Sequence, residues 1–332
     1  MTTNRQVLLA SRPRGPVDES NFHIVEAPVP RPAEGEVLVR NQWLSLDPYM
    51  RGRMSEAKSY VAPVAIDAVM VGQTVGEVVE SRDPRIAVGD VVLTQLGWQT
   101  YGVAKAAEVI KVDARRAPAS YYLGILGMPG MTAWFGLREI GQPKPGETVV
   151  VSAASGAVGS VVGQLAKTLG CRAVGIAGGK AKCDYVVREL GLDACVDHRA
   201  GALHEQLEAA CPGGIDVDFE NVGGVVLDTV LRRMNRNGRV VVCGLIADYD
   251  AAQPYGYTRL RAILVNRLRV QGMIVFDWKD RYGEALAGLA ELLAQGKLKY
   301  RESIVEGIDH APRALMGLLK GENFGKQLVK LA

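Results

Sequence analysis

The chain has 332 residues, more than one hydrophobic core usually organises, so two domains are expected. Hydrophobic residues make up 48% and charged residues 23%, as in ordinary globular enzymes, and a net charge of +3 disfavours nucleic acid or an anionic membrane as the main partner. No apolar stretch reaches the roughly 18 residues of a membrane span, and the first residues lack a signal-like cleavage pattern, so we expect a cytoplasmic protein.

Residues up to about 125 are predicted to form short β-strands separated by glycine and proline. The segment "EVLVRNQWLSL" alternates apolar and polar residues, and "VGQTVGEVVE" and "VGDVVLTQLGW" follow it with turn residues between. Strands at this spacing predict a compact, mainly β, largely antiparallel barrel or sandwich.

From Glu147 onward, apolar runs alternate with helical patterns, including patterns at 203–210 and 224–234. "LRVQGMIVF" (268–276) is predicted to be the last strand, followed by the helix "RYGEALAGLAELLAQG". This alternation predicts an α/β domain with a doubly wound parallel sheet of the Rossmann type. After residue 296 the alternation of strands and helices stops, and this tail is expected to pack on the first domain. The expected domains are therefore 1–125 with 297–332, and 126–296.

The first turn of the α/β domain, Ala153 to Gly159, follows the strand "ETVVVS" and opens a helix predicted to end at Gly170. Ala153 stands where the first glycine of Gly-x-Gly-x-x-Gly would be, and Gly156 and Gly159 follow it. A strand, this turn and a helix in that order favour a dinucleotide whose pyrophosphate lies at the helix start, over a plain packing turn.

The second strand predicts which dinucleotide binds. NAD enzymes usually place Asp or Glu at its end to accept from the ribose 2′-hydroxyl, whereas this chain has "AGGKAK" (177–182) there. Two ammonium groups, Lys180 and Lys182, together with glycines suit a 2′-phosphate, so NADP(H) is predicted. After the third strand, His198 is predicted to stack on adenine or to bind the 2′-phosphate, with Arg199 adding charge; a surface histidine is the equal alternative.

The five cysteines follow the glycine turn at wide spacings, without a Cys-x-x-Cys pair, so neither a disulfide framework nor a zinc ribbon is expected. The first half has no cysteine and one histidine, His23, and no metal site is predicted. Cys243 is interpreted as a small strand residue rather than a nucleophile, and His204 and His310 as ordinary histidines.

Six segments occur in a characteristic order: "LSLDPYMRGRM" (44–54), "GMPGMTAWFGL" (127–137), "AASGAVGSVVGQLAK" (153–167), "ENVGG" (220–224), "CGLIADY" (243–249) and "GENFGKQLVK" (321–330). In these the chain resembles the zinc-independent leukotriene/prostaglandin reductase group of the medium-chain dehydrogenase/reductase superfamily. The resemblance implies a GroES-like catalytic domain, a Rossmann domain, a homodimer, and reduction of the double bond of an α,β-unsaturated ketone or aldehyde.

The resemblance also implies site residues. Tyr249 would bond the nicotinamide ribose and could serve as the proton donor, and Tyr49 and Tyr60 would line the substrate pocket; half-buried packing is the alternative for each. The implied cofactor contacts are Gly156, Ala157, Val158, Gly159, Lys182, Asn221, Cys243, Gly244, Leu245, Tyr249, Met273, Ile274, Val275 and Asn323. At His198 the chain departs from its relatives, which often have Tyr there, so His198 is a predicted contact from its position in the sequence and not from the resemblance.

Asp47-Pro48-Tyr49 stands roughly where related zinc alcohol dehydrogenases have their catalytic cysteine, so hydrogen-bond donors rather than a metal are expected to stabilise a developing enolate. Two alternatives stay open. One is a quinone oxidoreductase of the same superfamily. The other is a protein that binds NADPH without turning it over.

Overall fold

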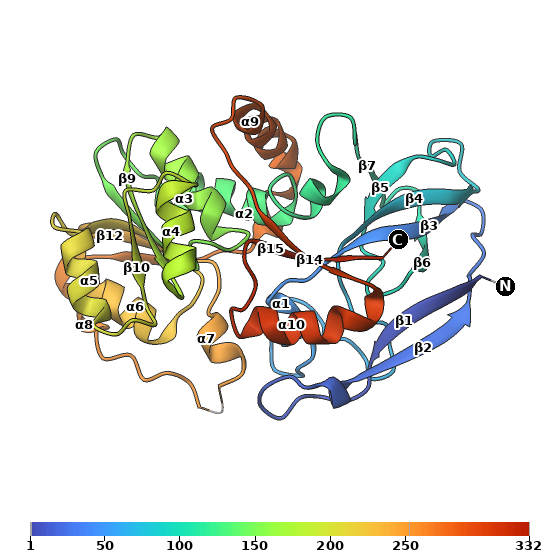
Figure 1. The fold of residues 1–332 in the computed structure, drawn as a ribbon, viewed down its shortest axis with the longest axis horizontal. Helices are drawn as coiled ribbons and strands as arrows, with labels where there is room; N and C mark the ends of the chain where they lie inside the picture. Colours follow the sequence, from blue (N-terminus) through green and yellow to red (C-terminus); the bar gives the residue numbers. More distant parts are fainter. Residues whose placement is uncertain (1, 252, 332) are drawn as a thin grey trace. The chain divides into compact units, whose positions relative to one another are not determined.

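The computed structural model describes residues 2–251 and 253–331. The chain forms two compact units: unit 1 runs up to Gly124 and resumes at Glu302, and unit 2 spans Ile125–Arg301. Figure 1 shows the carboxyl-terminal strands of unit 1 in red beside its blue amino-terminal strands. The last residues of the chain therefore complete the unit that the first residues begin.

Unit 1 is built on a seven-stranded sheet in the order β14-β15-β3-β4-β5-β7, with β6 also paired to β3, and on a separate β1–β2 hairpin. All pairs are antiparallel except β14 with β15. This arrangement confirms the mainly β prediction. The strands are β1 (Thr3–Leu9), β2 (Phe22–Pro28), β3 (Glu36–Ser45), β4 (Thr74–Ser81), β5 (Val91–Thr94), β6 (Tyr101–Lys105), β7 (Ile110–Lys111), β14 (Glu302–Glu306) and β15 (Lys326–Lys330). The helical segments are η1 (Glu19–Asn21), α1 (Tyr49–Arg53), η2 (Ala119–Leu123), η5 (Ile308–His310) and α10 (Ala311–Leu319).

The core of unit 1 joins segments from both ends of the chain. Trp98 is fully buried and stacks on Phe22, with ring centroids 5.6 Å apart. Met50 of α1 and Leu315 of α10 are buried in the same apolar cluster. Helix α1 has only five residues, too few to be stable alone, so this burial holds it in place.

Unit 2 contains a six-stranded parallel sheet in the order β10-β9-β8-β11-β12-β13. The chain passes from β8 to β9 and β10 on one side and then crosses to β11, β12 and β13 on the other, so the strand order reverses between β8 and β11. The strands are β8 (Thr148–Ser152), β9 (Arg172–Ala177), β10 (Ala194–Asp197), β11 (Ile215–Glu220), β12 (Met234–Val242) and β13 (Arg269–Gly272). The helical segments are α2 (Met128–Phe135), η3 (Gly136–Gly141), α3 (Gly159–Thr168), α4 (Lys180–Arg188), α5 (Leu203–Ala210), α6 (Gly224–Leu231), α7 (Ile246–Tyr249), α8 (Arg261–Asn266), η4 (Val275–Arg281) and α9 (Tyr282–Ala294).

Helices cover both faces of this sheet. Helix α3 packs on β8 and β9 and also contacts α2, while apolar residues of α5 and α6 join the buried valines of the sheet in one cluster. Every residue of β8 is buried, as expected for a central parallel strand. Gly170, with φ of 77°, follows α3 where the sequence predicts its end. The doubly wound α/β prediction is confirmed.

Two predicted elements are wrong in extent. Helix α6 ends at Leu231 rather than 234, because Met234 begins β12. The last strand, β13, ends at Gly272 instead of continuing to residue 276. Of the apolar residues after it, Val275 and Phe276 belong to η4, where the Trp278 ring stacks on Phe135 of α2 at 5.7 Å. An apolar run thus covers the helices instead of extending the sheet.

The chain re-enters unit 1 at Glu302, later than residue 297, where the sequence places the boundary. Lys299 explains the difference, because its backbone bonds α3 in both directions. Its amide donates to Gln164 Oε1 at 2.7 Å, and its carbonyl accepts from Gln164 Nε2 at 2.9 Å. The segment before Glu302 is therefore held on unit 2.

Asp218 is a buried carboxyl group in the middle of β11. It is fully buried between Val150 and Val240 of the neighbouring strands, and neither carboxyl oxygen has a hydrogen-bond partner among the described residues. Burial and the nearby Glu220 raise its pKa well above the usual range, so the folded state keeps it protonated.

Asp218→Asn is therefore expected to stabilise the protein, and more so as the pH rises. Because the folded-state pKa is raised, the contribution of Asp218 to the free energy of unfolding is fully present only below the unfolded pKa of about 3.9. It then falls by roughly 1.4 kcal/mol per pH unit up to the folded pKa. Thermal melts from pH 5 to pH 8 should show the variant's advantage growing. Asp216→Asn is the control, because Asp216 accepts from Thr148 N and should not gain stability. A constant difference across the pH range would contradict the prediction.

Candidate functional site

The turn between β8 and α3 lies where the strand order of the parallel sheet reverses, the usual ligand position in doubly wound folds. Ala153 has φ of 50°, a left-handed conformation that glycine adopts more easily. A Cβ on Gly159 would lie 2.4 Å from the Ala153 carbonyl oxygen, so only glycine fits there. Gly156, Ala157 and Val158 are partly exposed between them. The backbone of this turn is thus open to close approach by a ligand.

Three basic side chains gather at the turn after β9. A Cβ on Gly178 would lie 2.8 Å from both His198 Nε2 and Arg199 Nε, so these two groups border the space that glycine leaves. Burial and the charge of Arg199 lower the pKa of Lys182. Burial, Arg199 and Lys182 also lower the pKa of His198, against the effect of Asp197. Basic groups held this close together favour an anion between them.

The carboxylate of Asp197 is engaged by the backbone of the same turn. Its Oδ1 accepts from Gly179 N at 2.8 Å and from Arg199 N at 2.9 Å, and these bonds, led by that of Gly179, hold its pKa below the usual range. Asp197 lies at the end of β10 rather than β9, where NAD enzymes place their acid. It shapes the turn that carries the basic side chains.

Lys180 and Lys182, which are both predicted from the sequence to suit a 2′-phosphate, have different surroundings in the structure. Lys180 is 81% exposed in its side chain, and its Nζ donates to Asp184 Oδ2 at 2.5 Å one helical turn away. Lys182 is partly buried and lies within reach of the charge of Arg199. Lys182 is therefore the better candidate for anion binding.

A hydrogen-bond network orders the loop after β11. Glu220 is fully buried, and one of its oxygens accepts from Ser152 Oγ at 2.5 Å, Val222 N at 2.6 Å and Gly223 N at 3.0 Å. Asn221 is tied to β8, because its amide donates to Ser152 Oγ and its Nδ2 to the Ser152 carbonyl. The predicted contact Asn221 is thus fixed beside the end of β8.

The same loop holds the segment from residue 243 to 249. Cys243 N and Gly244 N both donate to the Glu220 carbonyl oxygen. A Cβ on Gly244 would lie 3.4 Å from both the Tyr249 hydroxyl and the Asn221 carbonyl oxygen. The structure therefore brings Tyr249 together with Asn221 and Gly244. Burial, with Glu220 nearby, raises the pKa of the Cys243 thiol to about 12, which leaves it neutral.

Most of the predicted cofactor contacts that directly follow β13 are buried. Met273 and Val275 are buried, and a Cβ on Gly136 would lie 2.6 Å from the Met273 sulfur. The side chain of Met273 therefore packs against Gly136 of η3, and its backbone amide donates to the Val242 carbonyl at 3.1 Å. Ile274 is only partly buried. Leu245 packs against Gly223.

The remaining predicted residues belong to unit 1. Tyr49 is the first residue of α1, and burial and the Asp47 charge raise its pKa above the usual range, against the effect of Arg53. Tyr60 is 57% exposed and lies near enough to Tyr49 to affect it. Asn323 donates from Nδ2 to the Gly325 carbonyl at 2.7 Å. Both tyrosines predicted for the substrate pocket thus lie in one region of unit 1.

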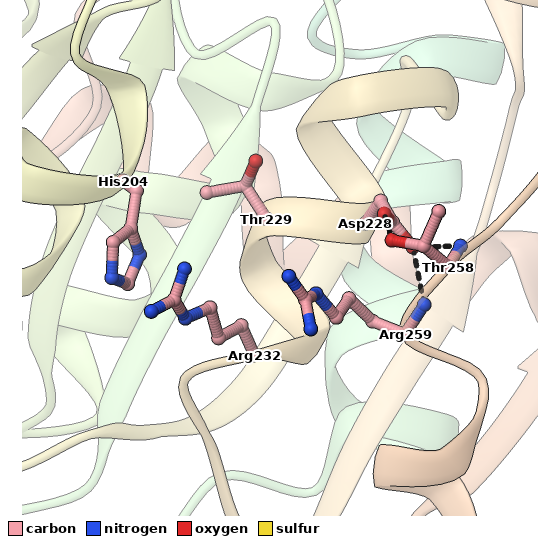
Figure 2. A pocket seen from close by; sticks show the side chains of 6 residues that line it. All are labelled: His204, Asp228, Thr229, Arg232, Thr258 and Arg259. Carbon is pink, nitrogen blue, oxygen red and sulfur yellow. Dashed lines mark hydrogen bonds between the residues drawn. The ribbon is translucent and has the colours of Figure 1, made fainter.

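A separate surface pocket lies on α5, α6 and the segment before α8 (Figure 2). Asp228 anchors it by accepting from Thr258 N and Arg259 N. His204, Thr229 and Arg232 complete the lining with those residues, and none of them is a predicted site residue. The pocket is distinct from the site at the sheet's reversal point.

No group of three or more His, Cys, Asp and Glu side chains in residues 2–251 and 253–331 is arranged to hold a metal ion. No helix in that part of the chain has the length and apolar composition needed to cross a membrane.

Sequence reasoning missed Ser152 and Glu220, which order the loop carrying Asn221. A signal was present, because both are polar residues at the ends of strands that are otherwise buried. Their pairing was not visible, since 68 residues separate them.

The comparisons with known proteins place the chain among reductases. Residues 5–112 match the family "N-terminal domain of oxidoreductase", and residues 157–291 match "Zinc-binding dehydrogenase". The chain is 48% identical to the NADPH-dependent curcumin reductase of Escherichia coli, over 99% of this chain and 97% of that protein. It is 42% identical to the NADP⁺-dependent 2-alkenal reductase of Nicotiana tabacum (99% and 98%) and 40% identical to prostaglandin reductase 1 of Oryctolagus cuniculus (93% and 88%).

Among solved structures, CurA of Vibrio vulnificus in complex with NADPH is 48% identical, with a TM-score of 0.94 over 99% of each chain. The quinone oxidoreductase of Escherichia coli in complex with NADPH is 23% identical, with a TM-score of 0.77 over 98% of this chain and 99% of that one. At that identity the quinone enzyme shares the fold alone.

Proposed function

Because the chain belongs to the zinc-independent leukotriene/prostaglandin reductase group of the medium-chain dehydrogenase/reductase superfamily, we propose that it is an NADPH-dependent reductase of α,β-unsaturated ketones and aldehydes. The bond reduced is the carbon–carbon double bond. The names of the curcumin and 2-alkenal reductases support this class of substrate. The observation that carries the choice of NADPH is the basic cluster of Lys182, His198 and Arg199 around Gly178.

Residues of unit 2 would contact the pyrophosphate, the 2′-phosphate and the nicotinamide half of this cofactor. The partly exposed turn Gly156–Val158, followed by the buried Gly159, would bind the pyrophosphate at the start of α3. Lys182, His198 and Arg199 would hold the 2′-phosphate beside Gly178, against which the His198 and Arg199 side chains pack. The ordered segment after β12, with Asn221 and Tyr249, would bind the nicotinamide half.

When bound, NADPH supplies a hydride to the β-carbon of the unsaturated carbonyl compound. The contribution of the chain is to stabilise the negative charge that then develops on the carbonyl oxygen. We assign the hydrogen bond to this oxygen, and the later delivery of a proton, to the Tyr249 hydroxyl. Tyr49 and Tyr60 would orient the substrate. The raised pKa of Tyr49 keeps its hydroxyl protonated, and so able to donate, at neutral pH.

The test is a panel of substrates mixed with the enzyme and either NADPH or NADH, with and without EDTA. We expect loss of NADPH absorbance with a 2-alkenal and an aromatic enone, formation of the saturated product, and full activity in EDTA. Faster turnover of a quinone would favour the quinone reductase alternative. NADPH binding without turnover of any compound would favour a nucleotide-binding protein that is not an enzyme.

In this proposal unit 1 is the catalytic domain and unit 2 the NADP-binding domain. The cytoplasm is the proposed compartment. All five cysteines are free, as is usual in reducing compartments.

We also propose a homodimer formed through β13. This strand is at the edge of the parallel sheet, and all four of its residues are exposed. Val270 is 42% exposed on it, and Leu264 of the preceding α8 is 79% exposed. An unpaired edge flanked by exposed apolar side chains suits pairing with a second copy across a two-fold axis.

Val270→Lys is expected to shift the protein from dimer to monomer, because a lysine on each copy would place like charges across the pairing strands. Sedimentation velocity at several concentrations measures the change. Val187→Lys is the control, since Val187 is 38% exposed but lies on α4. A wild-type protein that sediments as a monomer would contradict the homodimer.

A further inference from the structure

Lys326 is a buried lysine that none of the proposed steps uses. It is only 1% exposed on β15, and its Nζ donates to the Leu46 carbonyl at 2.7 Å and to Asp47 Oδ1 at 2.6 Å. Asp47 is 5% exposed. Removing both charges from water is costly, and a pair of apolar residues is often as stable in such a place. The ion pair between Lys326 and Asp47 is therefore weak evidence for a contribution to the stability of the protein, and we consider another role for it.

The pair holds the junction between β3 and α1. The second oxygen of Asp47 accepts from Ser45 Oγ, and the Asp47 carbonyl accepts from Met50 N at 3.1 Å inside α1. The neighbouring Leu46 amide donates to the Gln327 carbonyl at 3.2 Å. The two residues that precede Pro48 and Tyr49 are thus fixed from β15 through both side chain and backbone.

Tyr49 follows this junction directly in the chain and packs against the apolar cluster that contains Met50. It is the first residue of α1, and Pro48 at the N-cap makes no side-chain capping bond. A five-residue helix without a cap does not set the direction of its own first side chain. The carboxylate of Asp47 also lies near enough to influence the Tyr49 hydroxyl.

A second carboxyl group faces Lys326 but is engaged elsewhere. Glu302 accepts from Ser120 Oγ at 3.0 Å, and burial raises its pKa. Its effect on Lys326 is smaller than that of Asp47, which both bonds the ammonium and attracts it. The Lys326 ammonium is therefore directed at Asp47.

We propose that Lys326 is a positioning residue for enone reduction, which fixes Asp47 and thereby the Tyr49 hydroxyl against the substrate. This inference rests on the proposed function, because it assigns Tyr49 to the substrate pocket. It adds the carboxyl-terminal strand to the elements that determine substrate binding.

The experiment compares three proteins. Lys326→Met alone leaves Asp47 buried and unpaired, so loss of stability is expected. Asp47→Leu/Lys326→Met replaces the pair with apolar residues and is expected to recover the melting temperature. Lys330→Met, at the exposed end of the same strand, is the matched control. The double variant should raise KM for an enone about tenfold or more, because small displacements of orienting groups cost this much. The Kd for NADPH should not change.

A second measurement does not depend on turnover. The protein is labelled with fluorotyrosine, and the Tyr49 resonance in the ¹⁹F spectrum is identified by its loss in Tyr49→Phe. This resonance should move in the double variant and stay in place in Lys330→Met. A double variant with wild-type stability, KM and Tyr49 resonance would overturn the inference. If the wild-type enzyme reduces no enone, the proposed function fails. The resonance then still decides whether Lys326 fixes Tyr49.

Discussion

Lys182→Ala is expected to weaken NADPH binding by about 10- to 100-fold and to leave NADH binding within about twofold. The range follows from the loss of one charge-assisted hydrogen bond, roughly 1.5–3 kcal/mol. NADH has no 2′-phosphate, so it does not use this bond. Titration of each cofactor, followed by quenching of tryptophan fluorescence, gives both dissociation constants.

Lys180→Ala is the matched control for this prediction. It removes the same charge two positions earlier in α4, but from an exposed side chain already paired with Asp184. It should change the two dissociation constants little. Equal weakening of NADPH and NADH by Lys182→Ala would mean that the lysine supports the turn and not the 2′-phosphate. The preference for NADPH would then lack its structural basis.

Tyr249→Phe is expected to lower kcat for enone reduction by about 100-fold, in addition to any weakening of NADPH binding from the lost contact with the nicotinamide half. Removing one donor to a developing oxyanion costs rates of this order. The Tyr249 hydroxyl lies over Gly244 beside the carbonyl oxygen of Asn221, in the segment proposed to hold the nicotinamide half. Single-turnover measurements with saturating NADPH isolate the chemical step.

Tyr257→Phe separates loss of a catalytic hydroxyl from loss of a structural one. Tyr257 Oη accepts from Gly224 N at 3.2 Å, so its removal should lower the melting temperature and leave the rate of hydride transfer close to wild type. If Tyr249→Phe behaves in the same way, the proton donor must be sought elsewhere, with Tyr49 the next candidate.

The fold follows closely from local patterns in the sequence. Strand β8 and helix α3 are marked by a β-branched run, a glycine turn and Gly170 at the helix end, all within a few residues of one another. Such signals come from neighbouring residues and need no knowledge of tertiary contacts. The error at β13 has the same origin. The apolar residues after Gly272 look like more strand, although the chain turns there into η4, whose Trp278 stacks on Phe135 of α2.

The candidate site was predictable only in part, because several of its groups depend on distant pairings. The lack of an acid after β9 can be seen in the sequence, but the difference between Lys180 and Lys182 requires the position of Arg199. The burial of Lys326 is harder still to predict from the sequence, since 279 residues separate it from Asp47. A lysine in a strand is normally taken to be exposed, and here the opposite holds.

The two crossings between units also set an order for folding during synthesis. All residues of unit 2 have been synthesised once Arg301 has been added, so its internal contacts need no residue that is made later. Unit 1 does need such residues, because residues 43–45 of β3 pair with β15, which follows unit 2 in the chain. Asp47 likewise has no ammonium partner until Lys326 has been synthesised. Unit 1 is thus begun before unit 2 and completed after it, and a ribosome that stops before β15 leaves residues 43–45 of β3 without their β15 partner.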